Sequence, residues 1–491
     1  MQTSGELIQF FPVSSALQHT VMAEQVAETV VKVRRTSMVK PAIPPPAKTL
    51  FLSNLDLFWI RFDSVQVFFF YKLSPVIEYT SLIQGLKKSL SSILVYFYPL
   101  AGRLKNGEAG RAEIDCTDGG VEFKEASISV PFEELEKDGF LRKPFYPKLA
   151  PEVDPSAYEK YSRPLVSIQV TAFDGGGICI GTRVHHVIAD GTSFYYFMKS
   201  WAECSRGLPI AKPPQHDRTV FKREKKNSPS ISYKAHDIVS VGIKGAKIFK
   251  FVPGESQSKH KMTSGRENEG KRADSLQKRA DLICSTFCFK EERIQELKKG
   301  SRASSSFVAV AAHFWRCVMR AREVPLEEAV YFLVMVDCRG RVKPRLLPTY
   351  FGNCISLGLA QTRARTLINT DISFAADVIQ QAISSCTEEA QINHLIEWVE
   401  SCNGNFLSEA GWEYGTKAVG SPTFPVYDMD YGWGKPVDVQ KADVKDIGEM
   451  VLTPPKDGGK SIMVSTYLPE HQMDLLHHLL FSERVNLSPK L

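Results

Sequence analysis

The residues with the clearest chemical potential in this chain lie in the segment RVHHVIADGTS, at positions 183–193. It places the imidazole of His186 four residues before the acid Asp190 and next to the turn-forming Gly191. An imidazole has an unperturbed pKa of about 6.5, so it exchanges protons near neutral pH. This combination of residue types indicates an enzyme that removes a proton from a nucleophile.

The elements around this segment predict where His186 lies. Apolar residues alternate up to Val184, which predicts a strand over 178–184. The run 193–202, bounded by glycines at 191 and 207, predicts a helix. His186 is therefore expected at a strand-to-helix corner, where a buried element ends at a rim or a channel.

Two other interpretations of this segment are weaker. A metal site would use His185, His186 and Asp190, but adjacent residues on a strand face opposite sides and no Cys/His cluster supports zinc. A Ser-His-Asp triad would need a serine nucleophile motif such as GxSxG, which the sequence lacks. We expect no metal and no nucleophilic serine.

Length and composition describe an ordinary soluble protein. The chain has 491 residues, of which 43% are hydrophobic and 24% charged. The apolar run 7–11 has no basic region before it and ends at Pro12, unlike a secretion signal, and no stretch of about 18 apolar residues suggests a membrane span. The ten cysteines lack metal-site spacing and favour free thiols in a reducing cytosol. We expect a cytoplasmic protein that does not bind membranes.

The net charge of +6 is concentrated between positions 212 and 302. Nucleic acid is the obvious alternative partner for such a stretch. Aromatic residues that could stack on bases are sparse there, and no nucleic-acid-binding motif accompanies the charge. A solvated linker is the preferred interpretation, and we expect no nucleic-acid partner.

The sequence divides into three parts. Residues 1–211 and 281–491 have mixed α/β patterns, and 212–280 is a polar, basic crossover whose centre, 254–279, is predicted to be disordered because it has almost no apolar residues. In the helix that starts near Ser304, His313 is expected beside the core. The other predicted strands are 64–71, 282–289 and 330–336, and the other predicted helices are 82–96, 291–299, 373–386 and 469–481.

A second motif lies near the C-terminus. The segment DYGWG contains Asp430, Tyr431, Gly432, Trp433 and Gly434. Two glycines around a tryptophan after a proline-led strand predict a tight turn, which core patterning alone does not require.

Together these motifs resemble the BAHD acyltransferases of plants, whose signatures are HxxxD and DFGWG. The order YPLAGRL, HHVIADG, SSFVAVAAHFWR, DCRGR, YFGN and DYGWGKP follows the family along nearly the whole chain, with Tyr431 replacing the usual phenylalanine. The resemblance implies an α/β fold with two domains similar to chloramphenicol acetyltransferase. Each domain is a mixed β-sheet flanked by helices, and an active-site channel runs between them.

The resemblance also implies a mechanism. His186 would act as general base on a small-molecule alcohol, glycoside or amine, with acyl-CoA as co-substrate, no permanently bound cofactor and no covalent enzyme intermediate. Asp190 would point away from the base and pair with Arg339 or Arg341. Asp430 is either a second proton acceptor or, preferably, a support for its turn, and Trp433 is expected to pack. We expect a monomer.

The second half offers a binding site for the phosphates of CoA. Ser304, Ser305 and Ser306 stand at a predicted helix start, where backbone N–H groups and hydroxyls bind anions. Lys299 and Arg302 lie just before it and favour a polyanion, although solvated charges at a helix end are the alternative.

The acceptor is only partly constrained. Family members that acylate shikimate or quinate carry an arginine ahead of the second motif, where this chain has Thr423. A carboxylate in a channel without a cation is costly, which disfavours these acids. Two rival functions stay open: a non-catalytic relative that binds small molecules, and an enzyme like the condensation domains of peptide synthetases, which share HHxxxDG but lack DYGWG.

Overall fold

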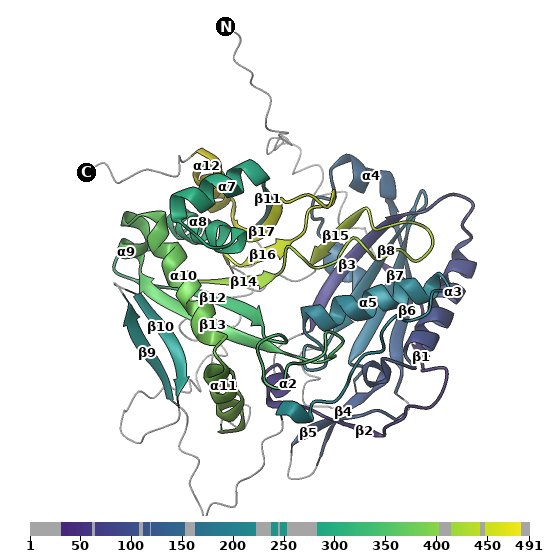
Figure 1. Cartoon of the computed structure of the whole chain (residues 1–491). Helices are drawn as coiled ribbons and strands as arrows, with labels where there is room; N and C mark the ends of the chain where they lie inside the picture. Colours follow the sequence, from purple (N-terminus) through teal and green to yellow (C-terminus); the bar gives the residue numbers. More distant parts are fainter. Residues whose placement is uncertain are drawn as a thin grey trace, which may run out of the picture.

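Two mixed β-sheets with helices packed against them organise the chain (Figure 1). The computed structural model describes residues 31–60, 64–107, 111–117, 119–152, 163–221, 237–243, 246–252, 282–401, 414–441 and 447–482. The α/β prediction with two mixed sheets is confirmed.

The first sheet has six strands, and only its second and third strands are parallel to each other. In spatial order the strands are β1 (Lys32–Val39), β6 (Val121–Pro131), β7 (Val166–Asp174), β8 (Gly177–Val184), β3 (Val65–Lys72) and β15 (Asp438–Lys441). Helices α3 (Tyr79–Ile93) and α5 (Gly191–Ser205) cover one face, and α4 (Phe132–Lys137) packs on the other. Because both faces are covered, β3 is apolar on both sides: Phe69 joins the core under α3 and α5, and Phe68 joins the core under α4.

The second sheet has eight strands. In spatial order they are β11 (Leu282–Phe289), β17 (Ile462–Pro469), β16 (Met450–Thr453), β14 (Gly415–Gly420), β12 (Ala329–Asp337), β13 (Ile355–Arg363), β10 (Ala246–Val252) and β9 (Asp237–Ile243). The pairs β12–β14 and β14–β16 are parallel. The helices of this half are α7 (Glu291–Ser301), α8 (Ser306–Ala321), α9 (Ala364–Asn369), α10 (Ile372–Cys386), α11 (Glu389–Ser401) and α12 (Glu470–Ser482).

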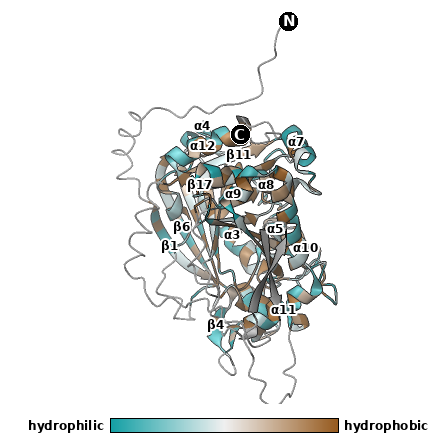
Figure 2. Ribbon diagram, turned by 90° about the vertical axis from the view of Figure 1, so that its left-hand side faces the viewer, coloured by the Kyte–Doolittle hydropathy of each residue, from teal (hydrophilic) through white to brown (hydrophobic). Residues whose placement is uncertain are grey.

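Helix α8 lies at the centre of the second core. Its start is defined by Ser305, whose hydroxyl accepts a hydrogen bond from the backbone N–H of Val308 at 3.2 Å, as expected for an N-cap. Most of its residues are buried, and it is mainly hydrophobic, whereas the neighbouring α7 is mainly hydrophilic (Figure 2). His313 is buried in this core with Nε2 at 3.0 Å from the carbonyl oxygen of Leu480, so the expectation of a core neighbour is confirmed.

A small sheet and several short helices lie outside the two main sheets. The sheet has the order β2 (Thr49–Phe51), β5 (Ala112–Asp115) and β4 (Arg103–Asn106), and the short helices are α2 (Asn54–Leu57), η1 (Tyr98–Ala101), η3 (Tyr146–Leu149) and η5 (Thr219–Phe221). Helix α2 comes from the first half, yet Leu55 and Phe58 share a core with Ile392 and Ile396 of α11.

Three strands join a sheet across the predicted boundaries. β15 follows the DYGWG motif in the second half of the sequence but pairs antiparallel with β3 in the first sheet. β9 and β10, within the predicted crossover, form a hairpin that extends the second sheet through β13. The division of the chain into 1–211, 212–280 and 281–491 stays a prediction. β15 and the β9–β10 hairpin each pair with a sheet that lies mainly in another of these three parts.

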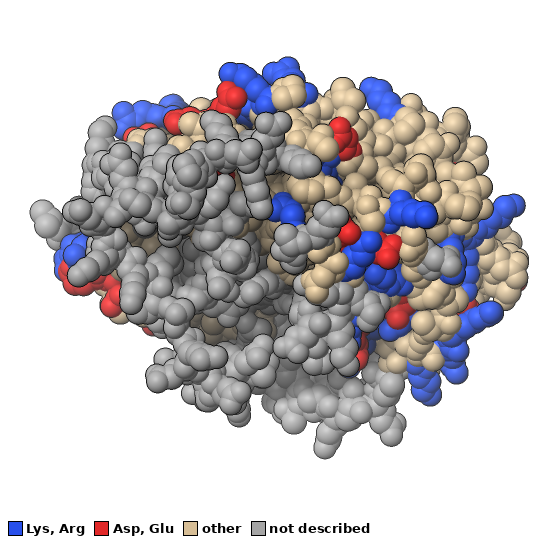
Figure 3. Space-filling view, turned by 90° about the horizontal axis from the view of Figure 1, so that it is seen from below, with Lys and Arg blue, Asp and Glu red and all other residues tan. Residues whose placement is uncertain are grey.

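The basic crossover is described only in part. Residues 222–236, 244–245 and 253–281 lie outside the described residues, including the segment 254–279 that is predicted to be disordered. The expectation of solvated charge is wrong for Arg218, which is 1% exposed. On the described part of the face in Figure 3, basic and acidic side chains are interspersed.

The predicted elements agree closely with the observed ones. The strands predicted at 178–184, 282–289 and 330–336 correspond to β8, β11 and β12, and the helices predicted at 291–299, 373–386 and 469–481 correspond to α7, α10 and α12. The helix predicted over 82–96 starts earlier, at Tyr79, and ends at Ile93. Within the described ranges, no helix is both long and apolar enough to cross a bilayer.

Candidate active site

His186 lies in the turn between β8 and α5, where three distant segments meet. Its ring stacks on Trp59, with ring centroids 3.9 Å apart and planes inclined by 17°. Its Nδ1 lies 3.1 Å from the side-chain oxygen of Asn353, which belongs to the YFGN segment before β13. The corner predicted from the sequence therefore lies at the junction of the two halves.

The surroundings of His186 keep its imidazole neutral. Burial lowers the pKa of His186 from 6.5 to about 4, while a hydrogen bond with its own backbone, the charge of Asp190 and the hydrogen bond with Asn353 act in the opposite direction. The side chain is nevertheless partly exposed. At neutral pH the ring is therefore uncharged, accessible and able to accept a proton.

Asp190 caps helix α5 and ties it to the second half. Its Oδ1 accepts hydrogen bonds from the backbone N–H of Ser193 at 3.0 Å and from Arg339 at 2.8 Å, and its Oδ2 accepts one from the N–H of Cys354 at 3.0 Å. Although burial acts to raise it, these donors, Arg339 above all, hold the pKa of Asp190 below its ordinary value. Asp190 is thus an ionised acceptor that is occupied by structural partners.

Of the two arginines considered as partners of Asp190, Arg339 makes the contact. Arg339 also donates to Asp337 at 3.0 Å and to Ser193 Oγ at 3.0 Å. Arg341 is exposed and donates instead to the carbonyl oxygen of Asp337 at 2.7 Å. The first arginine of DCRGR joins the two halves, and the second stabilises its own turn.

Gly191 allows close packing beside the base. A Cβ atom at this position would lie 2.6 Å from Cζ of Phe424. Phe424 belongs to the segment ahead of DYGWG, and its ring also lies 4.9 Å from that of Tyr195. The glycine after Asp190 is thus required by a contact with the second half of the chain.

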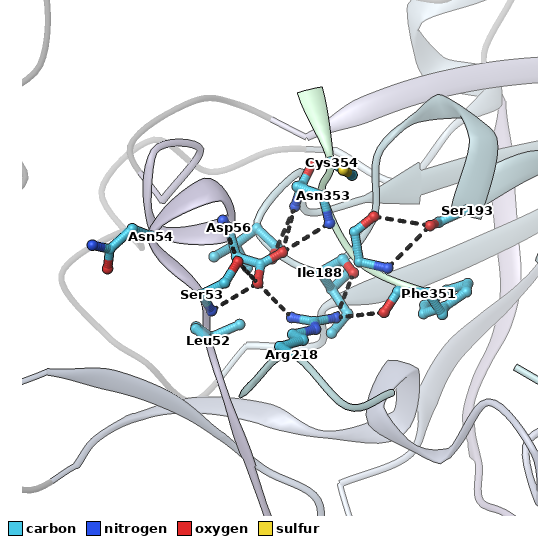
Figure 4. Close-up of polar contacts among 12 residues, drawn as sticks. Leu52, Ser53, Asn54, Asp56, Ile188, Ser193, Arg218, Phe351, Asn353 and Cys354 are labelled. Carbon is cyan, nitrogen blue, oxygen red and sulfur yellow. Dashed lines mark hydrogen bonds and ion pairs between the residues drawn. The ribbon is translucent and has the colours of Figure 1, made fainter. Parts of the chain in front are cut away.

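A buried polar network that sequence reasoning missed supports Asn353 (Figure 4). Oδ1 of Asp56 accepts hydrogen bonds from the backbone and side-chain nitrogens of Asn353, at 2.9 and 3.0 Å. Oδ2 of Asp56 pairs with Arg218 at 3.1 Å, and both side chains are fully buried. Asp56 lies in the SNLD segment and Arg218 in the basic crossover, and nothing in the residues around either one indicates that the two meet. Only Asn353 belongs to a motif, YFGN, that the sequence analysis names.

The DYGWG segment forms the predicted tight turn. Oδ1 of Asp430 accepts hydrogen bonds from the N–H groups of Gly432 at 2.8 Å and Gly434 at 3.1 Å. Both glycines have positive φ, 109° and 106°, where a side chain would be strained. The other oxygen of Asp430 lies 3.9 Å from Arg206. The carboxylate is therefore engaged in holding the turn.

The aromatic residues of this turn are packed. The Tyr431 ring stacks on Trp433, with centroids 5.5 Å apart, and meets Trp201 edge-on at 4.9 Å. Tyr431 is 2% exposed, yet its hydroxyl has no hydrogen-bond partner among the described residues. The hydroxyl that distinguishes Tyr431 from the family's usual phenylalanine is thus buried without a described partner, and burial raises the pKa of Tyr431.

The residues considered for CoA lie together at the start of α8. The Ser304 hydroxyl donates to Gln380 at 2.5 Å, and Arg302 donates to Ser373 Oγ at 3.2 Å, so both contact α10. Lys299 is in the last turn of α7. Ser306 is the first residue of α8. The structure brings these residues together, on the helical side of the second sheet.

No metal site is seen where the sequence offered one as an alternative. Nδ1 of His185 accepts a hydrogen bond from the N–H of Val187 at 3.2 Å, so His185 is used locally. Across the described ranges, no group of three or more His, Cys, Asp or Glu side chains is placed to hold a metal ion.

Comparisons with known proteins agree with this geometry. Residues 29–480 match the family model described as Transferase family. Hydroxycinnamoyl-CoA:5-hydroxyanthranilate N-hydroxycinnamoyltransferase HHT4 of Avena sativa is 30% identical over 89% of this chain and 96% of its own length. BAHD acyltransferase DCR of Arabidopsis thaliana is 31% identical over 91% of each chain. The crystal structure of vinorine synthase is 21% identical and superposes with a TM-score of 0.65 over 92% of this chain and 98% of that one. Because the match spans nearly the whole chain, this protein belongs to the BAHD acyltransferases of the Transferase family.

Proposed function

We propose that this acyltransferase moves an acyl group from a CoA thioester to a hydroxyl or amine of a small plant metabolite, with His186 as general base. The observation that carries the proposal is a neutral, partly exposed imidazole at the junction of the two halves. The acyl groups that fit the relatives are of the hydroxycinnamoyl or benzoyl type, with malonyl and acetyl as alternatives.

The reaction needs one base and no covalent enzyme intermediate. As the acceptor oxygen or nitrogen attacks the thioester carbonyl, its proton passes to His186, and a tetrahedral oxyanion forms. The oxyanion collapses, the C–S bond breaks, and the CoA sulfur leaves with the proton returned by the imidazolium. Such general-base assistance contributes about 10² to 10⁴ in rate.

Asp190 and Asp430 have supporting roles in this proposal. Asp190 holds α5 against the second half through Arg339. Asp430 stabilises the turn through Gly432 and Gly434, and this is the role we assign to it in place of proton acceptor. Both oxygens of Asp190 accept hydrogen bonds, and Oδ1 of Asp430 accepts two from its own turn, which favours structural roles for both residues.

The start of α8 is the proposed site for the CoA phosphates. Backbone N–H groups at the start of a 16-residue helix attract anions, and Ser304, Ser305 and Ser306 lie at this helix start. Lys299 and Arg302 add positive charge near them. A polyanionic co-substrate is favoured by this arrangement, in a manner that salt weakens.

The acceptor is proposed to be an alcohol, a glycoside or an amine without a carboxylate, because Thr423 stands where an arginine would pair with one. The Thr423 hydroxyl pairs with Ser421 Oγ at 2.8 Å, and this neutral pair offers no positive charge. Shikimate and quinate, whose carboxylate would need a cation, are therefore not the proposed acceptors.

The enzyme is proposed to act as a cytosolic monomer without a permanent cofactor, a nucleic-acid partner or membrane attachment. The cysteines in the described ranges are free thiols, which fits a reducing compartment.

Replacing the base tests the proposal directly. His186→Ala is expected to lower kcat by at least about a hundredfold, because the proton has no acceptor in the transition state. Turnover is followed as free thiol released from acyl-CoA, with circular dichroism to verify the fold. His216→Gln is the matched control, because burial lowers the pKa of His216 to about 4 as well, but its ring contacts the carbonyl oxygen of Tyr96 at 2.8 Å, and its replacement should leave turnover unchanged. Near-normal turnover of His186→Ala would remove the base assignment.

A panel of substrates separates the rival functions. The purified protein is incubated with several acyl-CoAs and with phenolic, glycoside and amine acceptors, and thiol release is measured. Release that depends on both substrates supports an acyltransferase. Binding of acceptors without release from any pair would favour a non-catalytic relative, and activity only with acyl groups on a carrier protein would favour a condensation-type enzyme.

A further inference from the structure

We infer that Asn353, held by Asp56 and Arg218, is a positioning residue that fixes His186 in the tautomer with its proton on Nδ1 and a free lone pair on Nε2. This inference rests on the proposed role of His186 as base. It deepens that role by naming the residue that selects which ring nitrogen is basic.

The surroundings of the Asn353 amide determine which way it points. Its Nδ2 lies 3.0 Å from Oδ1 of Asp56, 2.8 Å from the carbonyl oxygen of His186 and 3.3 Å from that of Val187. All three neighbours are oxygens that accept hydrogen bonds. A rotated amide would place its own oxygen against all of them, so the NH₂ group must face this side.

The other side of the amide then determines the tautomer. The atom that lies 3.1 Å from Nδ1 of His186 is the amide oxygen, which can only accept a hydrogen bond. Nδ1 must therefore carry the proton. Since a neutral imidazole has one N–H group, Nε2 is unprotonated and is the nitrogen that can receive the acceptor's proton.

Asn353 is held firmly enough to select the tautomer. It is 0% exposed, and its backbone N–H also donates to Oδ1 of Asp56, at 2.9 Å. Asp56 in turn accepts from the N–H of Ser53 at 2.8 Å and pairs with Arg218 (Figure 4). The Asn353 amide has hydrogen-bond partners on both its nitrogen and its oxygen, so a rotation would leave buried polar atoms unpaired.

Arg218 connects this network to the main chain on both sides of the junction. It donates to the carbonyl oxygens of Ile188 at 3.1 Å and Phe351 at 3.2 Å. These carbonyls belong to the HVIAD and YFGN segments. The buried arginine therefore holds the segment of the base and the segment of its orienting amide in fixed relation.

The ring plane of His186 is fixed by a separate contact. Trp59, which follows α2, stacks on the imidazole with 17° between the planes. Asp56 and Trp59 are three residues apart, so one short segment of the first half supports both the orienting amide and the ring.

The group that orients His186 is the neutral amide of Asn353, and the carboxylate of Asp190 does not take this place. Asp190 uses its oxygens for Ser193, Arg339 and Cys354. A carboxylate on Nδ1 would stabilise the imidazolium strongly, whereas a neutral amide orients the ring and stabilises the charged form less. The base is thereby oriented and remains neutral.

The test is a long-range ¹H–¹⁵N spectrum of the full chain labelled with ¹⁵N at histidine, recorded at neutral pH. The signals of His186 are assigned by their loss in His186→Gln. We expect a protonated Nδ1 and a bare Nε2 in the unmodified protein. A protonated Nε2 would overturn the inference, whatever the turnover. Loss of activity plays no part in this readout, so it separates the inference from the proposed function, which fails if His186→Ala keeps its turnover.

Two variants at position 353 make opposite predictions. Asn353→Ala removes the acceptor, so Nε2 gains proton occupancy, kcat falls by about ten- to a hundredfold with little change in the KM for acyl-CoA, and the acid limb of the pH profile moves to lower pH. Asn353→Asp keeps an acceptor for the proton on Nδ1, so the tautomer is retained and the acid limb moves to higher pH. The inference would be contradicted if the acid limbs of the pH profiles of the two variants moved in the same direction, or if Asn353→Ala kept the tautomer of the unmodified protein.

Ser356→Ala is the matched control. Ser356 is buried on β13, three residues beyond Asn353, and its hydroxyl donates to the carbonyl oxygen of Cys386 at 2.7 Å. Its loss should lower Tm and leave the tautomer and the acid limb unchanged. A shift of both in Ser356→Ala would show that general loosening explains the effect of Asn353→Ala. If Asn353→Ala does not fold, the spectra of the unmodified protein and of Asn353→Asp decide.

Discussion

Asp190 acts on the active site through structure, because all its described partners are donors from the backbone or from Arg339. It is four residues from His186 in the sequence, but its nearest partners come from α5, from Cys354 directly after the YFGN segment and from DCRGR. The four-residue spacing of the HxxxD motif therefore separates the proposed base, His186, from the N-cap of α5, Asp190. An ionised acid at an N-cap also stabilises the helix that follows.

Removal of this carboxylate should lower stability as well as activity. Asp190→Ala leaves the buried guanidinium of Arg339 without its closest partner, at 2.8 Å, and is expected to cost about 3 kcal/mol in the free energy of unfolding. Asp337→Asn is the control, because Asp337 is more exposed, at 43%, and its loss of charge should cost under about 1 kcal/mol. Urea unfolding measures both. Equal effects of the two changes would refute the structural role.

The close packing of Gly191 against Phe424 can also be tested by substitution. Gly191→Ala should destabilise the protein although alanine favours helices, because the new Cβ would lie 2.6 Å from the Phe424 ring. The double variant Gly191→Ala/Phe424→Ala removes the clash, so the two changes should be non-additive by about 1 kcal/mol or more. Additive changes in the free energy of unfolding would show that the ring moves aside freely.

At the scale of elements, the DYGWG turn positions the chain so that β15 can join the first sheet. The turn depends on one acceptor, Oδ1 of Asp430, and on positive φ at Gly432 and Gly434. β15 then pairs with β3 and begins with Asp438 opposite Phe70. The motif is thus the point at which the second half of the chain returns to the first.

Substitutions of Asp430 distinguish this role from proton transfer. Asp430→Asn keeps an oxygen that accepts from both glycine N–H groups, so turnover and Tm should stay within about twofold and a few degrees of the unmodified protein. Asp430→Ala removes the acceptor and should lower Tm clearly. A loss of about a hundredfold or more in kcat for Asp430→Asn, at unchanged Tm, would instead support the role of proton acceptor.

At the scale of the whole molecule, buried histidines link stability to pH. Burial lowers the pKa values of His186, His216 and His313 from 6.5 to about 4. Since the unfolded chain binds these protons more readily, their contribution is complete above about pH 6.5 and is lost as the pH falls towards about 4. Thermal unfolding between these pH values should show a falling Tm. His313→Gln should make the fall shallower, and an unchanged slope would mean that His313 does not contribute.

The sequence alone determined the local elements and the chemical identity of the motifs. The strand that ends at Val184 and the helix that starts near Ser304 depend on neighbouring residues, so periodicity was sufficient for them. The tight turn at DYGWG followed in the same way from its glycines. The motif order also indicated the family, and with it a base at His186.

The tertiary structure alone decided which distant groups meet. It selected Arg339 over Arg341 as the partner of Asp190, buried Arg218 of the basic crossover, and brought Asp56 to Asn353 across 297 positions. Such contacts depend on strand order and on the exchange of β15 between the halves. Hydrophobic periodicity reports only which face of an element is buried, so it carries no information about which polar groups of two remote elements share that interior.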